Sequence, residues 1–403
     1  MPIYLKYSSQ LVSHFLAPKS VVKNDQNLEK TLDNIVCISS LEEFKQLKND
    51  WNDLVEKSVN PHPFLLWEWM FTWWETFQEN NKLCILALYK ANNLIAIAPF
   101  YIKTQTKFLK RLSLIGEGEN KEDMIVTTYP DIIVKVGFET ESIKALAKYI
   151  SNEKLHSKKF NYAAFNLVHD KSILQQVGLK LSSNFINSKR HSENQFVIKL
   201  PEKEEDYDLS LSKSTRKQFR LKLNRMKKVG DINLSSVEDL TEGLSIVEKL
   251  HRARWHSKSE KNAFDSVKFS EFHKVLCERF QNQNILDFRV MRHDGEPIAA
   301  AYNFNYKQSC FSYMSGFHSS DDKRYSPMFI FDMLEIKNLI TKNYNCYDML
   351  VSESENNYKT KFCSEVNSVY TIHWFRKGII AVTLLSFMKI KPTLSKIYHK
   401  FIK

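Results

Sequence analysis

Residues 285–350 carry the pattern that most restricts the fold of this chain. The predicted elements are, in order, strands Ile285–Arg292, Pro297–Phe304 and Ser309–Gly316, a helix from Ser326 to Lys342, and a buried strand Cys346–Leu350. Asp294–Gly295 separates the first two strands and is typical of the type I′ turn of a β-hairpin. Ser326–Pro327 is a helix start, with serine as N-cap and proline at the first helical position. An antiparallel meander followed by a helix and another strand predicts an α+β fold.

The first half of the chain shows a different order of elements. Ser40 and Glu43 form a capping box that predicts a helix. A helix rich in tryptophan follows over Phe64–Phe77, and two apolar runs, Leu83–Tyr89 and Leu94–Ile102, predict a hairpin. The segment Lys189–Ser210 is polar and charged. We therefore expect an extension over residues 1–33, a first domain over 34–200, a second domain over 205–378 and a tail over 379–403.

The positive charge of the chain is concentrated in two places. The formal net charge is +12, from 58 basic and 46 acidic residues. No acidic residue interrupts the predicted helix 212–228, whose cations are Lys213, Arg216, Lys217, Arg220, Lys222, Arg225, Lys227 and Lys228. The tail from Arg376 to Lys403 is also free of acidic residues. Two such patches indicate a local anionic partner rather than a uniform coat of nucleic acid.

The cysteines and the apolar runs indicate a protein of the reducing cytoplasm. Six cysteines lie far apart, without a CxxC pair or a spacing that suits zinc. Met1–Ser20 lacks the continuous apolar core of a secretory signal. The longest apolar run, Gly378–Met388, is shorter than the roughly 20 residues of a membrane-spanning helix. We expect a cytoplasmic location, with peripheral contact at the inner face of a membrane.

Short motifs occur in a fixed order over roughly residues 40–378. In the first half they are Pro63–Trp69, Leu112–Gly116 and Pro130–Asp131. In the second half they are Ser212–Arg216, His251, Arg254–Trp255, Asp294–Ala299, Tyr313, Gly316–Phe317, Tyr325–Pro327, Tyr347–Asp348 and Tyr358–Lys359. Together they resemble the CelD-type (CelD/BcsL) acetyltransferases of polysaccharide biosynthesis, within the GNAT superfamily. The chain is also similar, more distantly, to the FemABX peptidyl transferases.

This resemblance implies two tandem GNAT-like domains with mixed, mostly antiparallel sheets flanked by helices. It also implies an acyltransferase that moves an acetyl or other acyl group from acyl-CoA to an amine or hydroxyl of a sugar or cell-envelope precursor. Acetyl-CoA or a longer acyl-CoA is then a co-substrate, with no tightly bound cofactor and no metal. The chain departs from single-domain GNAT proteins because it lacks their Q/R-x-x-G-x-G/A phosphate loop after the meander. Gly116–Glu117–Gly118 is a weak GxG signal in the first half.

Lys359, Tyr313 and Asp348 are the candidate catalytic residues. In the related transferases the lysine that matches Lys359 faces the substrate, where it stabilises negative charge; the alternative is an ordinary surface cation. Tyr313 shares a strand face with Phe311 and is either an oxyanion donor or a core aromatic. Asp348 is either a general base or the partner of an arginine, because a buried carboxylate is costly unless paired. His318 and Glu353 are rival bases.

Arg216, Lys217, Trp255, Tyr325 and Tyr358 are the candidate substrate-binding residues. Arg216 and Lys217 lie near the start of the basic helix, where a helix N-terminus and added cations hold phosphate or carboxylate. A solvated cationic surface is the alternative for the remaining cations of that helix. The tryptophans of the first half are assigned to the core rather than to a sugar-binding platform; they are Trp67, Trp69, Trp73 and Trp74.

Two other functions remain open. One is an aminoacyl-tRNA-dependent peptidyl transferase of FemABX type, in which the basic helix binds tRNA phosphates. The other is a non-catalytic binding subunit with a GNAT fold, consistent with the missing phosphate loop. The expected partners of the acyltransferase are acyl-CoA, a lipid-linked or envelope precursor and, through the tail 379–403, an anionic membrane surface. Packing of the tail against the second domain is the alternative.

Overall fold

The computed structural model describes residues 34–152, 160–256, 262–318, 325–352 and 358–386. The elements of the first half are β1 (Asn34–Ile38), α1 (Leu41–Gln46), α2 (Lys48–Glu56), η2 (Pro63–Leu65), α3 (Trp67–Phe77), β2 (Lys82–Leu83), β3 (Ile85–Lys90), β4 (Asn93–Ala98), β5 (Phe100–Thr104), β6 (Lys110–Leu114), η3 (Lys121–Asp123), β7 (Ile133–Val134), α4 (Glu139–Ser151), β8 (Tyr162–His169), α6 (Ile173–Lys180) and β9 (Phe185–Lys199).

The second half contains the expected meander, helix and strand. Its elements are α7 (Glu204–Ser210), α8 (Lys213–Lys227), β10 (Ile232–Val237), α9 (Leu240–His256), η4 (Ala263–Asp265), α10 (Val267–Gln281), β11 (Leu286–His293), β12 (Glu296–Tyr306), β13 (Ser309–Phe317), α11 (Pro327–Thr341), β14 (Cys346–Ser352), η5 (Tyr358–Lys361) and β15 (Glu365–Arg376). Asp294 and Gly295 both have positive φ, at 50° and 83°, as a type I′ turn requires. The hairpin prediction is therefore confirmed.

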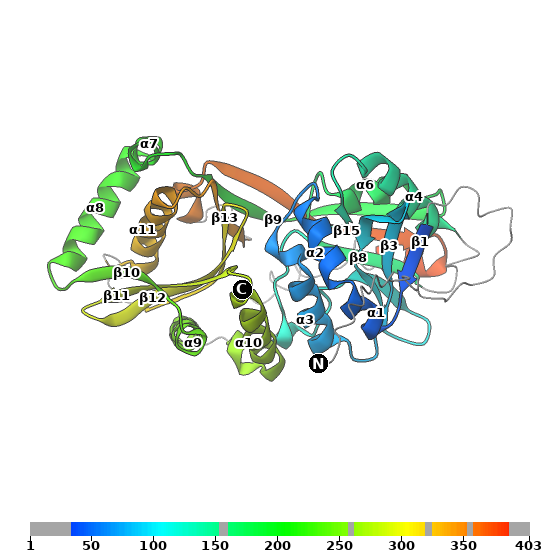
Figure 1. Ribbon diagram of the computed structural model, residues 1–403, viewed down its shortest axis with the longest axis horizontal. Helices are drawn as coiled ribbons and strands as arrows, with labels where there is room; N and C mark the ends of the chain where they lie inside the picture. Colours follow the sequence, from blue (N-terminus) through cyan, green and yellow to red (C-terminus); the bar gives the residue numbers. More distant parts are fainter. Residues whose placement is uncertain (1–33, 153–159, 257–261, 319–324, 353–357, 387–403) are drawn as a thin grey trace, which may run out of the picture.

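The described strands form two sheets. The smaller has the order β1-β3-β4-β7, and the larger has the order β10-β11-β12-β13-β14-β9-β15-β8-β6-β5-β2. Most neighbours are antiparallel, but β13 pairs with β14 in parallel, and β6 pairs with β8 in parallel. Helices lie against the faces of these sheets (Figure 1). The mixed α+β fold expected from the sequence is confirmed.

Pro99 divides the run Leu94–Ile102, predicted as one strand, into two strands that belong to different sheets. β4 ends at Ala98 and pairs with β3 and β7, whereas β5 begins at Phe100 and pairs with β2 and β6. A proline has no N–H group and cannot donate a hydrogen bond within a sheet, so the chain changes sheet at this residue. The prediction of a single strand was wrong.

β9 and β15 join the two halves (Figure 1). β9, the last strand of the first half, pairs with β14 of the second half, while β15, the last strand of the second half, pairs with β8 of the first. The two strands also pair with each other from Glu365 to Arg376. The segment Lys189–Ser210, predicted as a boundary, therefore lies within the large sheet as far as Lys199. Side chains 186–193 are exposed or half-buried, so this strand lacks the apolar alternation by which strands are recognised.

Three serines begin helices where the sequence placed them, but they do so in different ways. Ser40 makes both hydrogen bonds of the capping box with Glu43. Ser212 accepts a hydrogen bond from the Thr215 N–H at 3.1 Å and caps α8. Ser326 precedes Pro327 at the start of α11 without a side-chain cap; its hydroxyl instead accepts a hydrogen bond from Lys222 Nζ at 2.6 Å. This contact attaches α8 to the first turn of α11.

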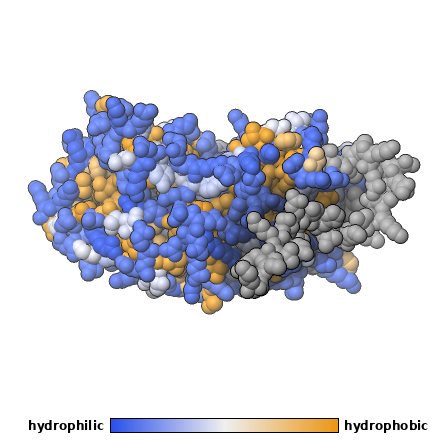
Figure 2. Space-filling view, viewed as in Figure 1, coloured by the Kyte–Doolittle hydropathy of each residue, from blue (hydrophilic) through white to orange (hydrophobic). Residues whose placement is uncertain are grey.

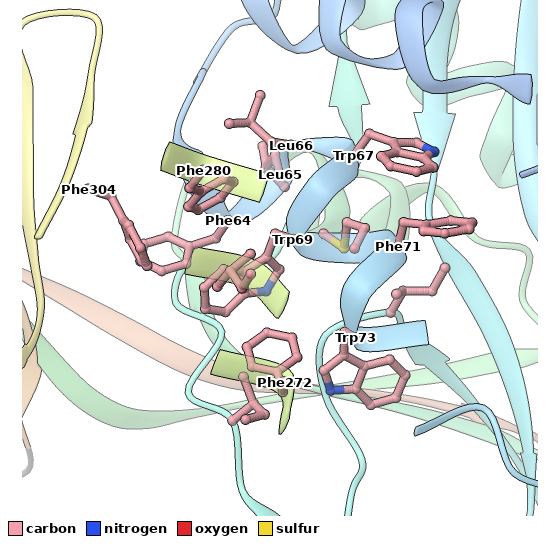
Figure 3. Packing of buried hydrophobic residues seen from close by; sticks show 14 of the residues in the cluster. Phe64, Leu65, Leu66, Trp67, Trp69, Phe71, Trp73, Phe272, Phe280 and Phe304 are labelled. Atoms are coloured by element: carbon pink, nitrogen blue, oxygen red, sulfur yellow. The ribbon is translucent and has the colours of Figure 1, made fainter. Parts of the chain in front are cut away.

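The largest hydrophobic cluster lies between the two halves. The four tryptophans of α3 are at most 5% exposed, so their assignment to the core is confirmed. Trp69 packs edge-on against Phe272 of α10 at 5.4 Å and against Phe304 of β12 at 5.9 Å between ring centroids. Figure 3 shows these rings meeting between α3 and the second half. Aromatic burial therefore holds the halves together.

No helix within the described ranges combines the length and the apolar character needed to cross a membrane. The predicted contact of the tail with an anionic membrane concerns residues 379–403, of which 387–403 lie outside the described residues. The predicted extension over residues 1–33 also lies outside them.

Candidate active site

β13 and β14 separate from one another beside the first turn of α11. They pair only over Ser309–Phe311 and Cys346–Asp348, although β13 continues to Phe317 and β14 to Ser352. Beyond these pairs, within the described residues, β13 and β14 do not pair with each other, although the Met349 carbonyl and the Leu350 N–H of β14 bond to the side chains of Lys359 and Asp348. We refer to this region as the C-terminal splay.

Lys359 lies at the C-terminal splay, on η5. Its ammonium group donates a hydrogen bond to the Met349 carbonyl of β14 at 2.5 Å and lies 5.9 Å from the centre of the Phe196 ring. The side chain is half-buried. Burial lowers the pKa of Lys359, while the nearby carboxylates of Asp332 and Asp348 act in the opposite direction. Contacts with its neighbours therefore fix the position of Lys359, which distinguishes it from an ordinary surface cation.

Tyr358 forms a dyad with Asp332 of α11. The Tyr358 hydroxyl donates a hydrogen bond to Asp332 Oδ2 at 3.0 Å. Tyr358 is 40% exposed, whereas Asp332 is only 1% exposed. Burial raises the pKa of Asp332 to about 7, against the lowering effects of Tyr358 and Lys359. Burial and the Asp332 carboxylate also raise the pKa of Tyr358 well above its usual range. Tyr358 is thus a neutral phenol whose hydroxyl is held by a buried carboxyl.

Asp348 joins the C-terminal splay to the first half of the chain. Its carboxylate accepts hydrogen bonds from Tyr129 Oη at 3.1 Å, from Gln195 Nε2 at 2.6 Å and from the Leu350 N–H at 2.7 Å. It is 3% exposed. Burial raises its pKa to about 6, although these three donors oppose that shift. Asp348 is therefore a satisfied carboxylate whose partners are a tyrosine and an amide, and these contacts favour a positioning role over that of a free base.

Tyr313 points into the aromatic core. Its ring lies 5.1 Å from Phe304, 5.4 Å from Trp69 and 5.6 Å from His273, between ring centroids. Burial raises its pKa above the usual range of a tyrosine. α11 packs in a different hydrophobic cluster, to which the meander contributes other residues, such as Cys310. These contacts favour the core interpretation of Tyr313 over the oxyanion-donor interpretation.

Arg216 and Lys217 lie on α8, which packs against α11 through Phe219, Leu223 and Met226. Arg216 is half-buried and Lys217 is exposed. Among the described residues neither side chain contacts Lys359 or Tyr358. Figure 1 places α8 on the outer side of α11, at the end of the molecule away from the first half. The structure therefore does not bring the two predicted groups of cations into direct contact.

The remaining predicted residues are distributed around the start of α11. Tyr325 is half-buried directly before Ser326 and packs against the cluster beneath α11. The side chain of Trp255 and residue Glu353 lie outside the described residues, and His318 follows the end of β13. The guanidinium carbon of Arg254, the residue before Trp255, lies 5.0 Å from the centre of the Phe317 ring. Burial lowers the pKa of Arg254, whereas the nearby Tyr358 raises it. Arg254 thus adds a cation near Tyr358.

α11 carries a second buried carboxyl, Glu335, whose partner is Arg289 of β11. Arg289 Nε donates to Glu335 Oε2 at 2.8 Å, and the two side chains are 4% and 0% exposed. Burial raises the pKa of Glu335 to about 7, although the Arg289 guanidinium lowers it. This pair anchors the middle of α11 to the sheet, one helical turn beyond Asp332.

Several of these residues were missed from the sequence. Asp332 lies within the apolar run Phe329–Leu334, and Glu335 follows it directly. An acidic residue at a buried helical position indicates a paired or functional carboxyl. Tyr129 and Gln195 gave no comparable signal. Both reach Asp348 from the first half of the chain, across more than 150 residues of sequence.

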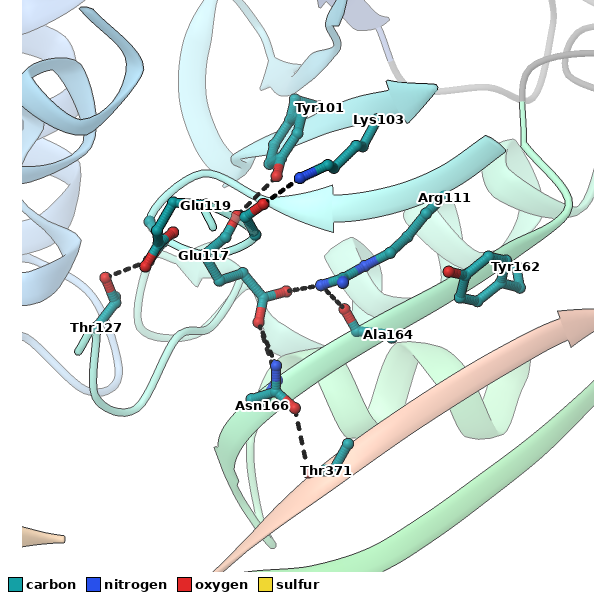
Figure 4. Close-up of polar contacts among 12 residues, drawn as sticks. Tyr101, Lys103, Arg111, Glu117, Glu119, Thr127, Tyr162, Ala164, Asn166 and Thr371 are labelled. Carbon is teal, nitrogen blue, oxygen red and sulfur yellow. Dashed lines mark hydrogen bonds and ion pairs between the residues drawn. The ribbon is translucent and has the colours of Figure 1, made fainter. Parts of the chain in front are cut away.

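The first half contains a corresponding splay between β6 and β8, which pair only over Arg111–Leu112 and Tyr162–Ala163. Here Glu117, within the Gly116–Gly118 turn, fills the space (Figure 4). Its carboxylate accepts from the backbone N–H and the side-chain amide of Asn166, both at 3.1 Å, and lies 3.4 Å from Arg111. An internal carboxylate thus satisfies the strand N–H that an extended ligand would need.

The comparisons with known proteins agree with this geometry. A family model described as an acetyltransferase (GNAT) domain matches residues 213–360, from α8 to η5. This part of the chain is therefore similar to a GNAT acetyltransferase domain, a fold that typically uses acyl-CoA as co-substrate. No group of His, Cys, Asp or Glu side chains suited to a metal ion occurs within the described ranges.

Two of the matching solved structures share the fold over most of this chain. The crystal structure of FemX has a TM-score of 0.56 at 10% identity, covering 84% of this chain and 96% of that one. The C-terminal domain of a putative lysylphosphatidylglycerol synthetase from Agrobacterium fabrum has a TM-score of 0.50 at 12% identity, covering 86% and 95%. At such identities the likeness concerns the fold alone. The search of curated proteins found no match.

Proposed function

We propose that this protein is an acyltransferase that moves an acetyl or longer acyl group from acyl-CoA to an amine or hydroxyl of a sugar or cell-envelope precursor. The observation that carries the proposal is the arrangement of Lys359 and the Tyr358–Asp332 dyad at the C-terminal splay of a GNAT domain. The CelD-type motifs of the sequence support the choice of acceptor.

We place the acyl donor at the C-terminal splay rather than at the splay of the first half. The backbone of β13 beyond Phe311 is not paired to β14, whereas Glu117 already bonds to the Asn166 N–H in the first half. α11 also begins in this part of the domain, and a helix N-terminus favours an anionic ligand. These features fit an extended acyl-CoA, with its thioester near η5.

In the proposed reaction the acceptor attacks the thioester carbonyl, and negative charge develops on the carbonyl oxygen. The ammonium group of Lys359 stabilises this charge. The neutral phenol of Tyr358, held by Asp332, gives its proton to the departing thiolate and takes up a proton from solvent, to which the acceptor loses its own proton. Asp348 and Tyr313 keep the two halves in register. Arg216, Lys217, Trp255 and Tyr325 lie on elements that border α11, and we propose that they attract the anionic part of a substrate.

The test measures release of free CoA from acetyl-CoA and longer acyl-CoAs in the presence of amino sugars and nucleotide sugars. We expect Lys359→Ala to lower turnover at least tenfold, which is about 1.4 kcal/mol in barrier height. Lys361→Ala is the matched control, because Lys361 is an exposed lysine of the same η5 turn and should retain full activity. Equal turnover in the two variants would contradict the role of Lys359.

Calorimetry separates this proposal from its two alternatives. An acyltransferase binds at least one acyl-CoA with measurable heat. A protein that binds no acyl-CoA, and that forms product only when aminoacyl-tRNA is supplied, is a FemABX-type transferase. A protein that does neither is a non-catalytic binding subunit.

A further inference from the structure

α8 carries a cationic outer face, of which the proposed reaction uses only Lys217. Its buried side holds Thr215, Phe219, Leu223 and Met226 against the cluster beneath α11. The other side is exposed and carries cations along its whole length; they are Lys213, Lys217, Arg220, Arg225, Lys227 and Lys228. None of these six side chains has an ion-pair partner in the described part of the chain. We call this side the α8 outer face.

The α8 outer face also exposes apolar side chains among its cations. Leu221 is 47% exposed and is the fourth residue after Lys217, so the two lie next to each other on the outer face. Val229, 72% exposed, follows the end of the helix, and Leu209 of α7, 71% exposed, precedes its start. A single exposed leucine is ordinary, but Leu221 on the cationic helix and Val229 at its end combine apolar contact with positive charge, whereas Leu209 lies on the acidic helix α7.

The position of α8 leaves this face accessible to a flat surface. In Figure 1 α7 and α8 form one end of the elongated molecule, and the first half lies at the other end. In Figure 2 the outer edge at that end is hydrophilic. A bilayer can therefore approach α8 without meeting the first half of the chain.

We propose that the α8 outer face docks the protein on an anionic phospholipid surface. The cations provide charge complementarity with lipid phosphates, and Leu221 and Val229 enter the boundary between headgroups and acyl chains. Exposed aliphatic side chains favour a lipid partner over RNA, because a single-stranded RNA site offers aromatic side chains for base stacking and the outer face has none. The inference concerns where the protein works and stands apart from the reaction proposed above.

The docked helix lies directly on α11. Lys222 joins α8 to Ser326 at the start of α11, beside the C-terminal splay. A surface bound to the α8 outer face is therefore connected to the start of α11 through α8 itself.

The experiment measures co-sedimentation of the full chain with vesicles of phosphatidylcholine that contain about a third phosphatidylglycerol. We expect binding that weakens with salt and is absent for phosphatidylcholine alone. Arg220→Glu with Lys228→Glu should weaken binding about thirtyfold or more, since each surface cation contributes roughly fivefold. Lys144→Glu with Lys274→Glu makes the same change of net charge on exposed positions of α4 and α10, and should change binding less than about threefold.

Leu221→Asn tests the apolar part of the proposal at constant charge. We expect it to weaken vesicle binding about fivefold and to leave CoA release from soluble substrates unchanged. The proposal is overturned if neither vesicle binds, or if both charge-reversed pairs lose binding equally. It is also overturned if total tRNA binds more tightly than vesicles and Leu221→Asn does not affect vesicle binding. Failure of the acyltransferase assay with intact vesicle binding counts against the reaction and not against docking.

Discussion

The hydroxyl of Tyr129 donates a hydrogen bond to the carboxylate of Asp348 over 3.1 Å. Tyr129 comes from the loop before β7 in the first half, and Asp348 comes from β14 in the second. Both side chains are at most 4% exposed, and the Tyr129 ring also stacks on His169 at 4.5 Å between ring centroids. A single buried contact therefore ties the loop of one half to the C-terminal splay of the other.

Tyr129→Phe should lower the free energy of unfolding by about 1–3 kcal/mol, because it leaves a buried carboxylate with one donor fewer. Denaturant titration followed by tryptophan fluorescence measures this change. Tyr89→Phe is the control, since the Tyr89 hydroxyl has no hydrogen-bond partner within the described ranges. If both variants lose the same stability, the hydrogen bond between Tyr129 and Asp348 contributes nothing to it.

The buried Asp332 predicts a pH dependence of stability. Burial raises its pKa to about 7, so between about pH 4 and pH 7 the folded protein keeps a proton that the unfolded chain has lost. The contribution of Asp332 to the free energy of unfolding must then fall as pH rises through this window, by at most about 1.4 kcal/mol per pH unit. Asp332→Asn should remove this contribution.

The measurement compares unfolding midpoints of Asp332→Asn and the parent protein from pH 4 to pH 8. The difference between them should grow in favour of the variant as pH rises toward 7. Asp206→Asn, an exposed substitution on α7, serves as control. A difference that stays constant with pH for Asp332→Asn would show that the carboxyl does not hold the proton in the folded state.

The buried pair of Arg289 and Glu335 should behave as a unit. Arg289→Met alone leaves Glu335 without its cation and should cost about 3–5 kcal/mol. The double variant Arg289→Met with Glu335→Leu removes both charges and should recover most of that loss, because two well-packed apolar side chains avoid the cost of burying charge. Thermal unfolding of the two single variants and the double variant tests this. If the double variant loses as much stability as the two single variants added together, Arg289 and Glu335 are not coupled.

Gly316 sets the close approach of β13 to α9. A Cβ atom added at this position would lie 2.3 Å from the His251 backbone nitrogen, and backbone cannot move aside as a flexible side chain does. Gly316→Ala should therefore push α9 from the sheet and cost roughly 1–3 kcal/mol or more. Ser315→Ala, on the neighbouring residue of the same strand, is the matched control. Circular dichroism during heating measures both, and equal midpoints would contradict the packing argument.

Local signals predicted the second half of the chain well. The Asp294–Gly295 turn, the meander and the helix beginning at Pro327 each follow from adjacent residues, because their turn and cap chemistry is local. Pro99 also carried a readable signal, since a proline within an apolar run opposes a continuous strand, yet the run was interpreted as one strand. The proposed division near residues 200–205 stays a prediction.

The candidate site depended on contacts that no local pattern records. Tyr358 and Lys359 were located through a family resemblance, but their partners Asp332 and Met349 come from α11 and β14. The polar strand β9 was assigned to a boundary because its pairing partners, β14 and β15, lie more than 140 residues further along the chain. Long-range pairing of polar segments leaves little trace in single-sequence periodicity.

The exchange of β9 and β15 has a consequence for anyone who divides this protein for expression. A fragment that ends after β9 would lack the strand that lies between β9 and β8, and a fragment that begins after β9 would leave β14 and β15 without their shared neighbour. Each piece would expose unpaired strand edges, which are templates for aggregation. The chain is in this sense a single cooperative unit, and truncated versions should be insoluble unless both pieces are produced together.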